Sequence, residues 1–493
     1  MGDDTHLTKE ESAAVTDAFL NAFLDLYPIA AQKAKRALTN VHNYPNMSIR
    51  DNGLPYFTSV WRNNARPDYE YALSGGSLLS PTLGALDEGN NLEPVKNLGK
   101  ILWDIPAFRK RLGEENIWYA EYEATKLIEQ ALLRYFNCYG VSDELDTDRG
   151  FIVVRPFLFA ITADRLPLAL VVPILMHSFE TDHYRLTDDS YVFKMRKPFQ
   201  LARSVSGDST GGVSRSVASS ATHAFVSMNW NIRAQASSGL ARSLTDASEP
   251  AFGEIDSFFA ALRLATNAVA GYAQILQVPR GWGVSYRWDL PAMYVSEHRR
   301  YPMFYDRAYS QNDALRSVPK ELMSDIRETY HQVLASKSNK MQLALRRLNA
   351  CVTRDDDIDA ILDAIIGIEL LLGDGNDSLN FKLRMRVAGL SKLTGGRFPP
   401  ENSYKEMGKL YETRSAIVHG SSRGKKSKDV EADRKTVYAS QRDLATRYLR
   451  MVIKTLLEHP QYLDPSLIDK KLLISFETAD EAPAQKDIPG LET

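Results

Sequence analysis

Residues 355–373 read DDDIDAILDAIIGIELLLG, and this stretch decides the fold of the C-terminal part of the chain. Its apolar residues recur at steps of three and four, which predicts a helix with one buried face. The aspartates at its start suit the positive end of a helix dipole, and Gly373 is suited to end the helix. We therefore expect a long apolar helix that neighbouring helices must cover.

Similar helical patterns lie before and after this stretch. The loops between them are short, which is typical of antiparallel neighbours in a helix bundle. The predicted helices cover residues 321–335, 339–352, 379–393, 404–419 and 431–457. Together they predict a mostly helical bundle over residues 316–478, followed by a polar, disordered tail over residues 479–493.

The N-terminal part of the chain has a mixed pattern. Helical periodicity covers residues 10–38, 115–139 and 254–276, whereas β-branched and aromatic runs predict strands at 151–162, 168–176, 191–195 and 282–288. The Ser- and Gly-rich segment 203–222 is typical of a linker or a mobile loop. We predict an α+β protein, in which a mixed α/β N-terminal region precedes the helical bundle. That region divides into a helical and irregular part at 1–145 and a β-containing part at 146–315.

The composition excludes several classes of protein. Hydrophobic residues make up 44% and charged residues 25% of the 493 residues, so the chain as a whole is not disordered. Lys and Arg number 60 and Asp and Glu 62, so binding to nucleic acid would need a local basic patch. The two cysteines are far apart, and the most apolar stretch, residues 166–176, is much shorter than the roughly 20 residues of a membrane span. We expect a cytoplasmic protein that does not bind membranes.

Two charged residues lie among the apolar positions of the predicted bundle. Arg414 lies on the apolar stripe of the 404–419 helix, and Glu369 lies on that of the 355–373 helix. A buried charge is costly unless it is paired, so these side chains are expected to pair with each other or to face a cavity. His419 ends the helix that carries Arg414, and five helical steps place the two side chains about 140° apart. A second copy of the helix across a two-fold axis would bring such groups into one cleft.

A basic segment follows His419. Residues 420–428 read GSSRGKKSK and contain no acidic residue; the basic residues are Arg423, Lys425, Lys426 and Lys428. Such a run is usually a solvated surface. Next to an Arg and a His, it also suits contacts to the phosphates of a nucleic acid.

The segment YETRSAIVHG, residues 411–420, resembles the R-x(4–6)-H signature of HEPN domains, with Arg414 and His419 as its Arg and His. The preceding helices are similar to those of the Apea-like branch of that superfamily. In order, that branch has a helix with an embedded Glu, here Glu369, then a helix with a K-L-x-x-R-like run, here FKLRMRVAGL at 381–390, and then the R-x(4)-H helix. The resemblance covers roughly residues 320–460, under a third of the chain.

The resemblance implies a helical, usually dimeric domain that cleaves RNA without a metal or a cofactor. His419 would act as the acid or base, Arg414 would stabilise charge on the phosphate, and Ser415 would assist them. Glu369 would form a supporting ion pair, and the basic segment would bind the RNA substrate. The family further implies a toxin of a bacterial antiviral, abortive-infection system, active as a homodimer, whose N-terminal region responds to a phage-derived trigger.

Two other interpretations remain open. Ser415 stands where the family often has Asn, Asp or His, which favours a non-catalytic RNA-binding or scaffolding domain with a purely structural Arg414–Glu369 pair. A separate ligand-binding or enzymatic site in the middle region is supported only by one cluster, which consists of His177, Glu180, Asp182 and His183. The cluster lacks the i, i+4 spacing of a helical metal motif, so we expect a solvated loop and no metal site.

Overall fold

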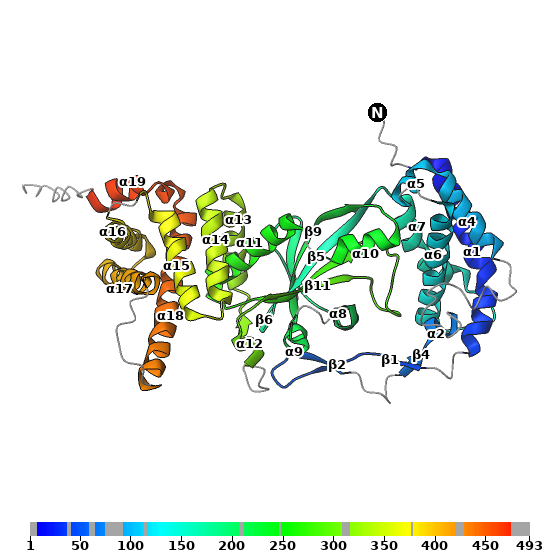
Figure 1. Cartoon of the computed structure of the whole chain (residues 1–493), viewed down its shortest axis with the longest axis horizontal. Coiled ribbons are helices and arrows are strands. Elements are labelled where there is room, and N and C mark those ends of the chain that lie inside the picture. Colours follow the sequence, from blue (N-terminus) through cyan, green and yellow to red (C-terminus); the bar gives the residue numbers. More distant parts are fainter. Residues whose placement is uncertain are drawn as a thin grey trace, which may run out of the picture. The chain divides into compact units, whose positions relative to one another are not determined.

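The computed structural model describes most of the chain (Figure 1). Its residues form two compact units: Met1–Phe258 with Ala270–Arg327, and Phe259–Val269 with Glu328–Thr493. Helix accounts for 62% and strand for 16%, which confirms the predicted α+β class with a helical C-terminal part. The predicted division at residues 145 and 315 stays a prediction. The described ranges are 7–36, 41–58, 65–73, 92–112, 116–206, 212–245, 248–307, 316–375, 378–419 and 428–474.

The first unit begins with a group of helices that share an aromatic core. Phe19 on α1 stacks on Phe157 of α7 with ring centroids 6.4 Å apart, and Tyr27 meets Tyr135 of α6 edge-on at 5.3 Å. Figure 1 shows α1, α4 and α6 side by side. These helices are α1 (Lys9–Arg36), α2 (Tyr69–Leu73), α4 (Glu93–Asp104), α5 (Pro106–Leu112), α6 (Ile117–Tyr139) and α7 (Thr147–Thr162). Gly140 ends α6, with a φ of +77°.

A six-stranded antiparallel sheet forms the rest of this unit's framework. Its strand order is β11-β10-β5-β9-β8-β7. The strands are β5 (Arg165–Pro173), β7 (His183–Arg185), β8 (Ser190–Lys194), β9 (His223–Arg233), β10 (Tyr272–Pro279) and β11 (Tyr294–Arg300). Val171, Val226 and Leu276 from three neighbouring strands share a buried core with Leu201 and Val217. These last two residues belong to the helices α8 (Lys197–Ser206) and α9 (Arg215–Ser219), which therefore pack on the sheet.

Short strands and helices complete the first unit. The strands β1 (Val41–Asn43) and β4 (Ala65–Pro67) form one antiparallel pair, and β2 (Asn46–Ile49) and β3 (Pro55–Thr58) form another. A parallel pair consists of β6 (His177–Phe179) and β12 (Arg316–Val318). The remaining helices are α10 (Ser237–Thr245), α11 (Glu249–Thr266) and α12 (Phe304–Arg307).

Two predictions for the first unit are wrong in secondary-structure type. Residues 151–162, predicted as a strand, form most of α7, because Asp146 caps this helix by accepting the N–H of Arg149 at 3.1 Å. Val153, Phe157 and Ala160 are buried at helical spacing. Residues 282–288, predicted as a strand, form no strand, and Trp288 has a φ of +55°.

The limits of two further segments were also predicted wrongly. The helix predicted at 254–276 ends at Thr266, because Asn267 adopts a φ of +55°, and Tyr272 begins β10 instead. The segment 203–222 is not a simple linker. The helix α8 continues to Ser206, residues 207–211 lie outside the described ranges, and α9 buries Val217.

The second unit is a helical bundle with α15 at its centre. The helix α15 packs against α14, α16, α17 and α18. Asp356 caps it by accepting the N–H groups of Ile358 at 2.8 Å and Asp359 at 3.0 Å. Its helices are α13 (Leu322–Ala335), α14 (Asn339–Thr353), α15 (Asp357–Leu372), α16 (Leu379–Ser391), α17 (Pro400–Val418), α18 (Lys428–Glu458) and α19 (Pro465–Ile468). The tail predicted at 479–493 lies outside the described residues.

The segment Phe259–Val269 belongs to this second unit, although it is distant in sequence. Ala260 and Leu264 are part of the core of the bundle. The buried guanidinium of Arg263 donates a hydrogen bond to Asn349 Oδ1, and Arg450 donates to the carbonyl of Ala268 at 3.4 Å. The helix α11 therefore contributes residues to both units, as does α13, which the division crosses between Arg327 and Glu328.

Glu129 on α6 makes the first unit sensitive to pH. Burial, with a smaller contribution from Glu70, raises the pKa of this side chain to about 8, so it is protonated at neutral pH. In the unfolded chain the pKa of this carboxyl is only about 4.3. The free energy of unfolding therefore falls as the pH rises from about 4 through 8, because the folded state binds a proton that the unfolded state has lost. Glu129→Gln is expected to remove this loss and to increase the free energy of unfolding at pH 8.5 by roughly 2–4 kcal/mol.

The measurement is the denaturant midpoint of wild type and variant between pH 5 and 9. The exposed Glu144→Gln is the matched control, because its carboxylate stays in solvent on folding. A Glu129→Gln variant with the same pH slope as the wild type would contradict the assignment of a buried neutral carboxyl.

Candidate functional site

The helix α17 carries three of the predicted site residues. Met407 and Leu410 bury the helix against the core of the bundle. Arg414 and Ser415 follow on its last turns and are partly buried, and His419 is the exposed C-terminal cap. The apolar stripe of α17 thus places Arg414 at the edge of the core, where its charge needs a partner.

Arg414 and Glu369 face each other across α17 and α15. Arg414 Nε lies 3.6 Å from Glu369 Oε1, and the side chains are 28% and 17% exposed, respectively. The structure therefore brings together the two charged residues that the sequence places on the apolar stripes of two different helices. Tyr411 lies one turn before Arg414, whose Cζ atom is 5.8 Å from the centre of the tyrosine ring.

This pair is looser than the ion pairs that Asp363 forms in the same bundle. Arg414 Nε and Glu369 Oε1 are both buried, but neither forms a hydrogen bond within the described residues. By contrast, Asp363 accepts Arg347 Nη1 at 2.6 Å and Arg354 Nε at 2.9 Å. A purely structural pair gains most of its stability from such hydrogen bonds. The guanidinium of Arg414 thus keeps hydrogen-bonding capacity that Glu369 does not use.

The environment of Glu369 is unfavourable for a negative charge. Burial raises the pKa of its carboxyl above the usual value, and the nearby Arg414 cation lowers it in part. Removing the positive charge of Arg414 would leave this carboxyl half-buried without its counter-charge. The ionisation of the Glu369 carboxyl therefore depends in part on the positive charge of Arg414.

His419 lies apart from this pair. Its backbone N–H donates to the carbonyl of Ser415 at 3.0 Å, so the helix keeps its regular geometry to its last residue. Within the described chain, the contacts of Arg414 run to Glu369 and Tyr411 and do not include His419. This arrangement agrees with the wide angular separation expected for five helical steps.

The basic segment is only partly described. Arg423, Lys425 and Lys426 lie outside the described residues. Lys428 is the first residue of α18, and its side chain is likewise outside what the structure describes. Their role in RNA binding stays a prediction.

The residues 177–183 form the expected solvated loop only in part, because Glu180, Asp182 and His183 are exposed whereas His177 is buried. His177 and Phe179 are buried in β6, and the Nδ1 atom of His177 lies 2.8 Å from the carbonyl oxygen of Leu175. His183 begins β7 on the edge of the sheet. In the described part of the chain, no three His, Cys, Asp or Glu residues are placed to hold a metal ion. Among those same residues, no helix combines the length and apolar character that crossing a bilayer requires.

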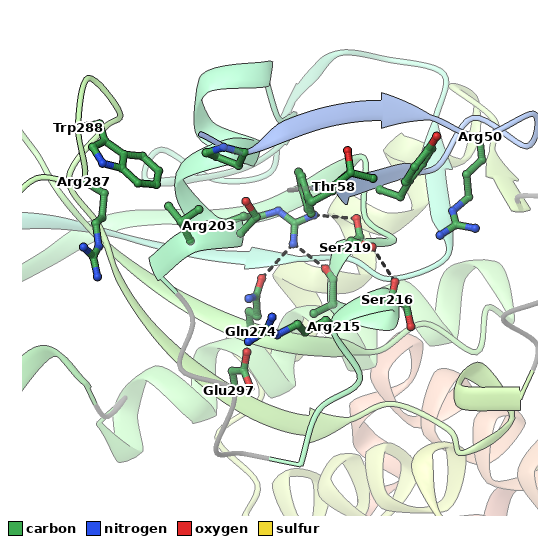
Figure 2. Close-up of a pocket in the computed structure, with 16 residues that line it drawn as sticks. Arg50, Thr58, Arg203, Arg215, Ser216, Ser219, Gln274, Arg287, Trp288 and Glu297 are labelled. Atoms are coloured by element: carbon green, nitrogen blue, oxygen red, sulfur yellow. Dashed lines mark hydrogen bonds between the residues drawn. The ribbon is translucent and has the colours of Figure 1, made fainter. Parts of the chain in front are cut away.

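A second candidate site, which the sequence did not reveal, is a cavity of about 680 Å³ in the first unit (Figure 2). Arg50, Arg203, Arg215 and Arg287 line it, from four different segments of the chain. No periodicity or motif links these positions, because only the packing of the β2–β3 hairpin, α8 and α9 with the sheet brings them together. Comparison of the chain with models of known families, with curated proteins and with solved structures finds no match.

Proposed function

We propose that the protein is a metal-independent endoribonuclease, with its reaction centre at the end of α17. The observation that carries this proposal is the loose ion pair of Arg414 with Glu369, 3.6 Å apart, on the helix that ends in the exposed His419. RNA supplies its own nucleophile, the 2′-hydroxyl, so the protein needs to provide only proton transfer and charge stabilisation.

In this proposal each residue has a distinct task. His419 removes the proton of the 2′-hydroxyl or donates a proton to the leaving 5′-oxygen, because its exposed imidazole can accept or donate a proton. Arg414 donates hydrogen bonds to the phosphate oxygens as negative charge grows on them. Glu369 holds Arg414 in place, Ser415 offers a hydroxyl close by, and the basic residues near 423–428 hold the RNA backbone.

The separation of Arg414 and His419 supports a site shared by two chains. The apolar side chain of Val418, next to His419, is 53% exposed, which suits burial in a contact between two copies of α17. We propose a homodimer formed through the C-terminal bundle, in which the two copies of the helix line one cleft. As the resemblance implies, the activity would serve bacterial antiviral defence, with the N-terminal unit responding to a phage-derived trigger.

The ends of the RNA products test this chemistry. Attack by the 2′-hydroxyl leaves a 2′,3′-cyclic phosphate or a 3′-phosphate, and it leaves DNA uncut. We expect such ends, and an unchanged cleavage rate in the presence of EDTA. The measurement is mass spectrometry of the products of a short single-stranded RNA, and the same preparation of His419→Ala is the control for contaminating nucleases. Products with 3′-hydroxyl ends, or a strict requirement for Mg²⁺, would refute this mechanism.

The second candidate function is a non-catalytic RNA-binding or scaffolding domain. Ser415 is the observation that favours it, together with the existence of the Arg414–Glu369 pair, which is also compatible with a structural role. An RNA-cleavage assay distinguishes the two functions, because a scaffold binds RNA and leaves it intact.

A further inference from the structure

The cavity of the first unit has a strongly positive wall. Among the described residues that line it, four are arginines and one, Glu297, carries a carboxylate. The chain as a whole has a net charge of −2, so this excess is local. Figure 2 shows Arg203 in the centre of the view, with Arg287 and Arg50 on opposite sides of it. Such a concentration of guanidinium groups favours an anion, because it offers both charge and directed hydrogen bonds.

Arg203 is a buried cation that has no carboxylate partner among the residues that the structure describes. Its side chain is 1% exposed, and its donors are satisfied by uncharged oxygen atoms within the described residues. These acceptors are Gln200 Oε1, Gln274 Oε1 and the carbonyls of Ala218, Ser219 and Ala221. Burial lowers the pKa of Arg203 to about 9, which leaves it a cation at neutral pH. An anion in the cavity would supply the counter-charge that the protein does not place beside it.

Arg215 and Arg287 are available for direct contacts. Both are exposed, and neither forms an ion pair with a residue of the described ranges. Their positions on α9 and in the turn before Asp289 are fixed by the packed backbone around them. Ser204 and Ser216 add hydroxyl groups to the same wall. The wall therefore combines the fixed positive charge of Arg203 with two exposed guanidinium groups that can donate hydrogen bonds to a ligand.

The turn that presents Arg287 and Trp288 is strained. Trp288 has a φ of +55°, a left-handed backbone conformation that is strained for a large side chain. The turn is held by Arg134, which donates to the carbonyls of Trp288 at 2.7 Å and Leu290 at 2.8 Å. His42 also stacks on the Trp288 ring, with centroids 4.6 Å apart. Strain that several contacts maintain is typical of functional sites, where it positions side chains for a ligand.

We propose that this cavity binds a phosphorylated nucleoside, with the phosphates on Arg215 and Arg287 near the buried charge of Arg203. The volume of about 680 Å³ lies in the range of cofactor- and drug-sized ligands and is far larger than a single phosphate needs. Tyr56, Phe57 and Trp288 supply apolar surface in the same cavity, which suits the flat base of a nucleotide. This binding is independent of the nuclease proposed for the second unit.

Calorimetric titration of the full chain tests the proposal. The four ribonucleoside triphosphates are added one at a time, and inorganic pyrophosphate is added in a parallel titration. We expect saturable binding of at least one triphosphate to one site per chain, at least tenfold tighter than that of pyrophosphate. The double variant Arg215→Gln with Arg287→Gln is expected to weaken this binding by 100-fold or more, since each lost charged contact is worth about a factor of ten.

Both substituted side chains are exposed, so the variant is expected to keep the fold, which circular dichroism checks. Arg155→Gln is the matched control, because this arginine is exposed on α7 and does not line the cavity; its affinity should equal that of the wild type. The absence of saturable binding by all four triphosphates would overturn the proposal. Equal affinity for pyrophosphate and the triphosphates, or an unchanged affinity in the double variant, would also overturn it.

Discussion

His419→Ala is expected to reduce the rate of RNA cleavage by at least 100-fold and to leave the stability of the protein unchanged. General acid–base catalysis contributes about 10²–10⁴ in rate, and no other imidazole stands on α17 to replace this one. The side chain is exposed at the end of the helix, so its removal creates no cavity in the core. The measurement is single-turnover cleavage of a labelled single-stranded RNA, with thermal unfolding followed in parallel.

His331→Ala is the control for this experiment, since His331 is an exposed histidine on another helix of the same unit, α13. It should cleave RNA at the wild-type rate. A His419→Ala protein that retained full activity would refute the role of His419 and, with it, the proposed reaction centre.

Variants of Arg414 and Glu369 separate the catalytic interpretation from the structural one. Arg414→Ala removes the phosphate-binding group and also leaves the half-buried carboxyl of Glu369 without its counter-charge. Arg414→Ala combined with Glu369→Gln removes that second effect. If the pair is only structural, the double variant recovers both stability and RNA binding; if Arg414 is catalytic, it recovers stability but stays inactive. Activity restored by mixing Arg414→Ala chains with His419→Ala chains would show that two subunits share the site.

Arg386→Met is expected to cause the largest loss of stability, about 2–4 kcal/mol in the free energy of unfolding of the second unit. The side chain of Arg386 is 1% exposed and forms ion pairs with Asp374 and Asp469, each at 2.6 Å. It also donates to the carbonyl of Leu372 at 2.6 Å. Methionine fills a similar volume but removes the donor that Arg386 provides to Asp469 and to this carbonyl, and it leaves Asp374 with Lys382 alone. Each aspartate is about a third exposed, so water compensates for part of the loss.

Urea-induced unfolding measures this effect, and Arg397→Met is the control, because Arg397 is exposed after α16. The hydrogen bonds from Arg386 and Lys382 hold the pKa of Asp374 well below its usual range. The contribution of the pair to stability is therefore present above about pH 4 and is lost as the pH falls further. A wild-type-like midpoint for Arg386→Met at pH 7 would contradict this account.

The sequence predicts the helical bundle well, and the physical reason is local. Each of its helices has apolar residues at helical spacing, and caps such as Asp356 lie next to the helix that they stabilise. The pairing of Arg414 with Glu369 was also predictable, because each charge lies on an apolar stripe that must be buried. The role of Lys382 and Arg386 was not, although both lie in the K-L-x-x-R-like run: their partner Asp374 lies in a loop whose position depends on packing.

The first unit was predicted less well because exposed apolar residues obscure the helical period of α7, in which Phe151 and Ile152 are 55% and 64% exposed. Residues 151–162 are apolar and β-branched in a way that suits a strand, yet a single cap and the neighbouring helices make them helical. The cavity could not be predicted from a single sequence. Arg50, Arg203 and Arg287 are separated by more than eighty positions from one another, and only the tertiary fold gives them a common surface.

The helix α11 has a practical consequence for dissecting the protein. A fragment that begins at residue 316, where the sequence suggests a boundary, would lack Phe259–Val269. Such a fragment would expose the apolar surface covered by Ala260 and Leu264 and would remove the donor that Arg263 provides to Asn349. Truncation at that boundary is therefore expected to yield a product that aggregates through this exposed apolar surface. A fragment that includes the whole of α11 would keep the surface covered.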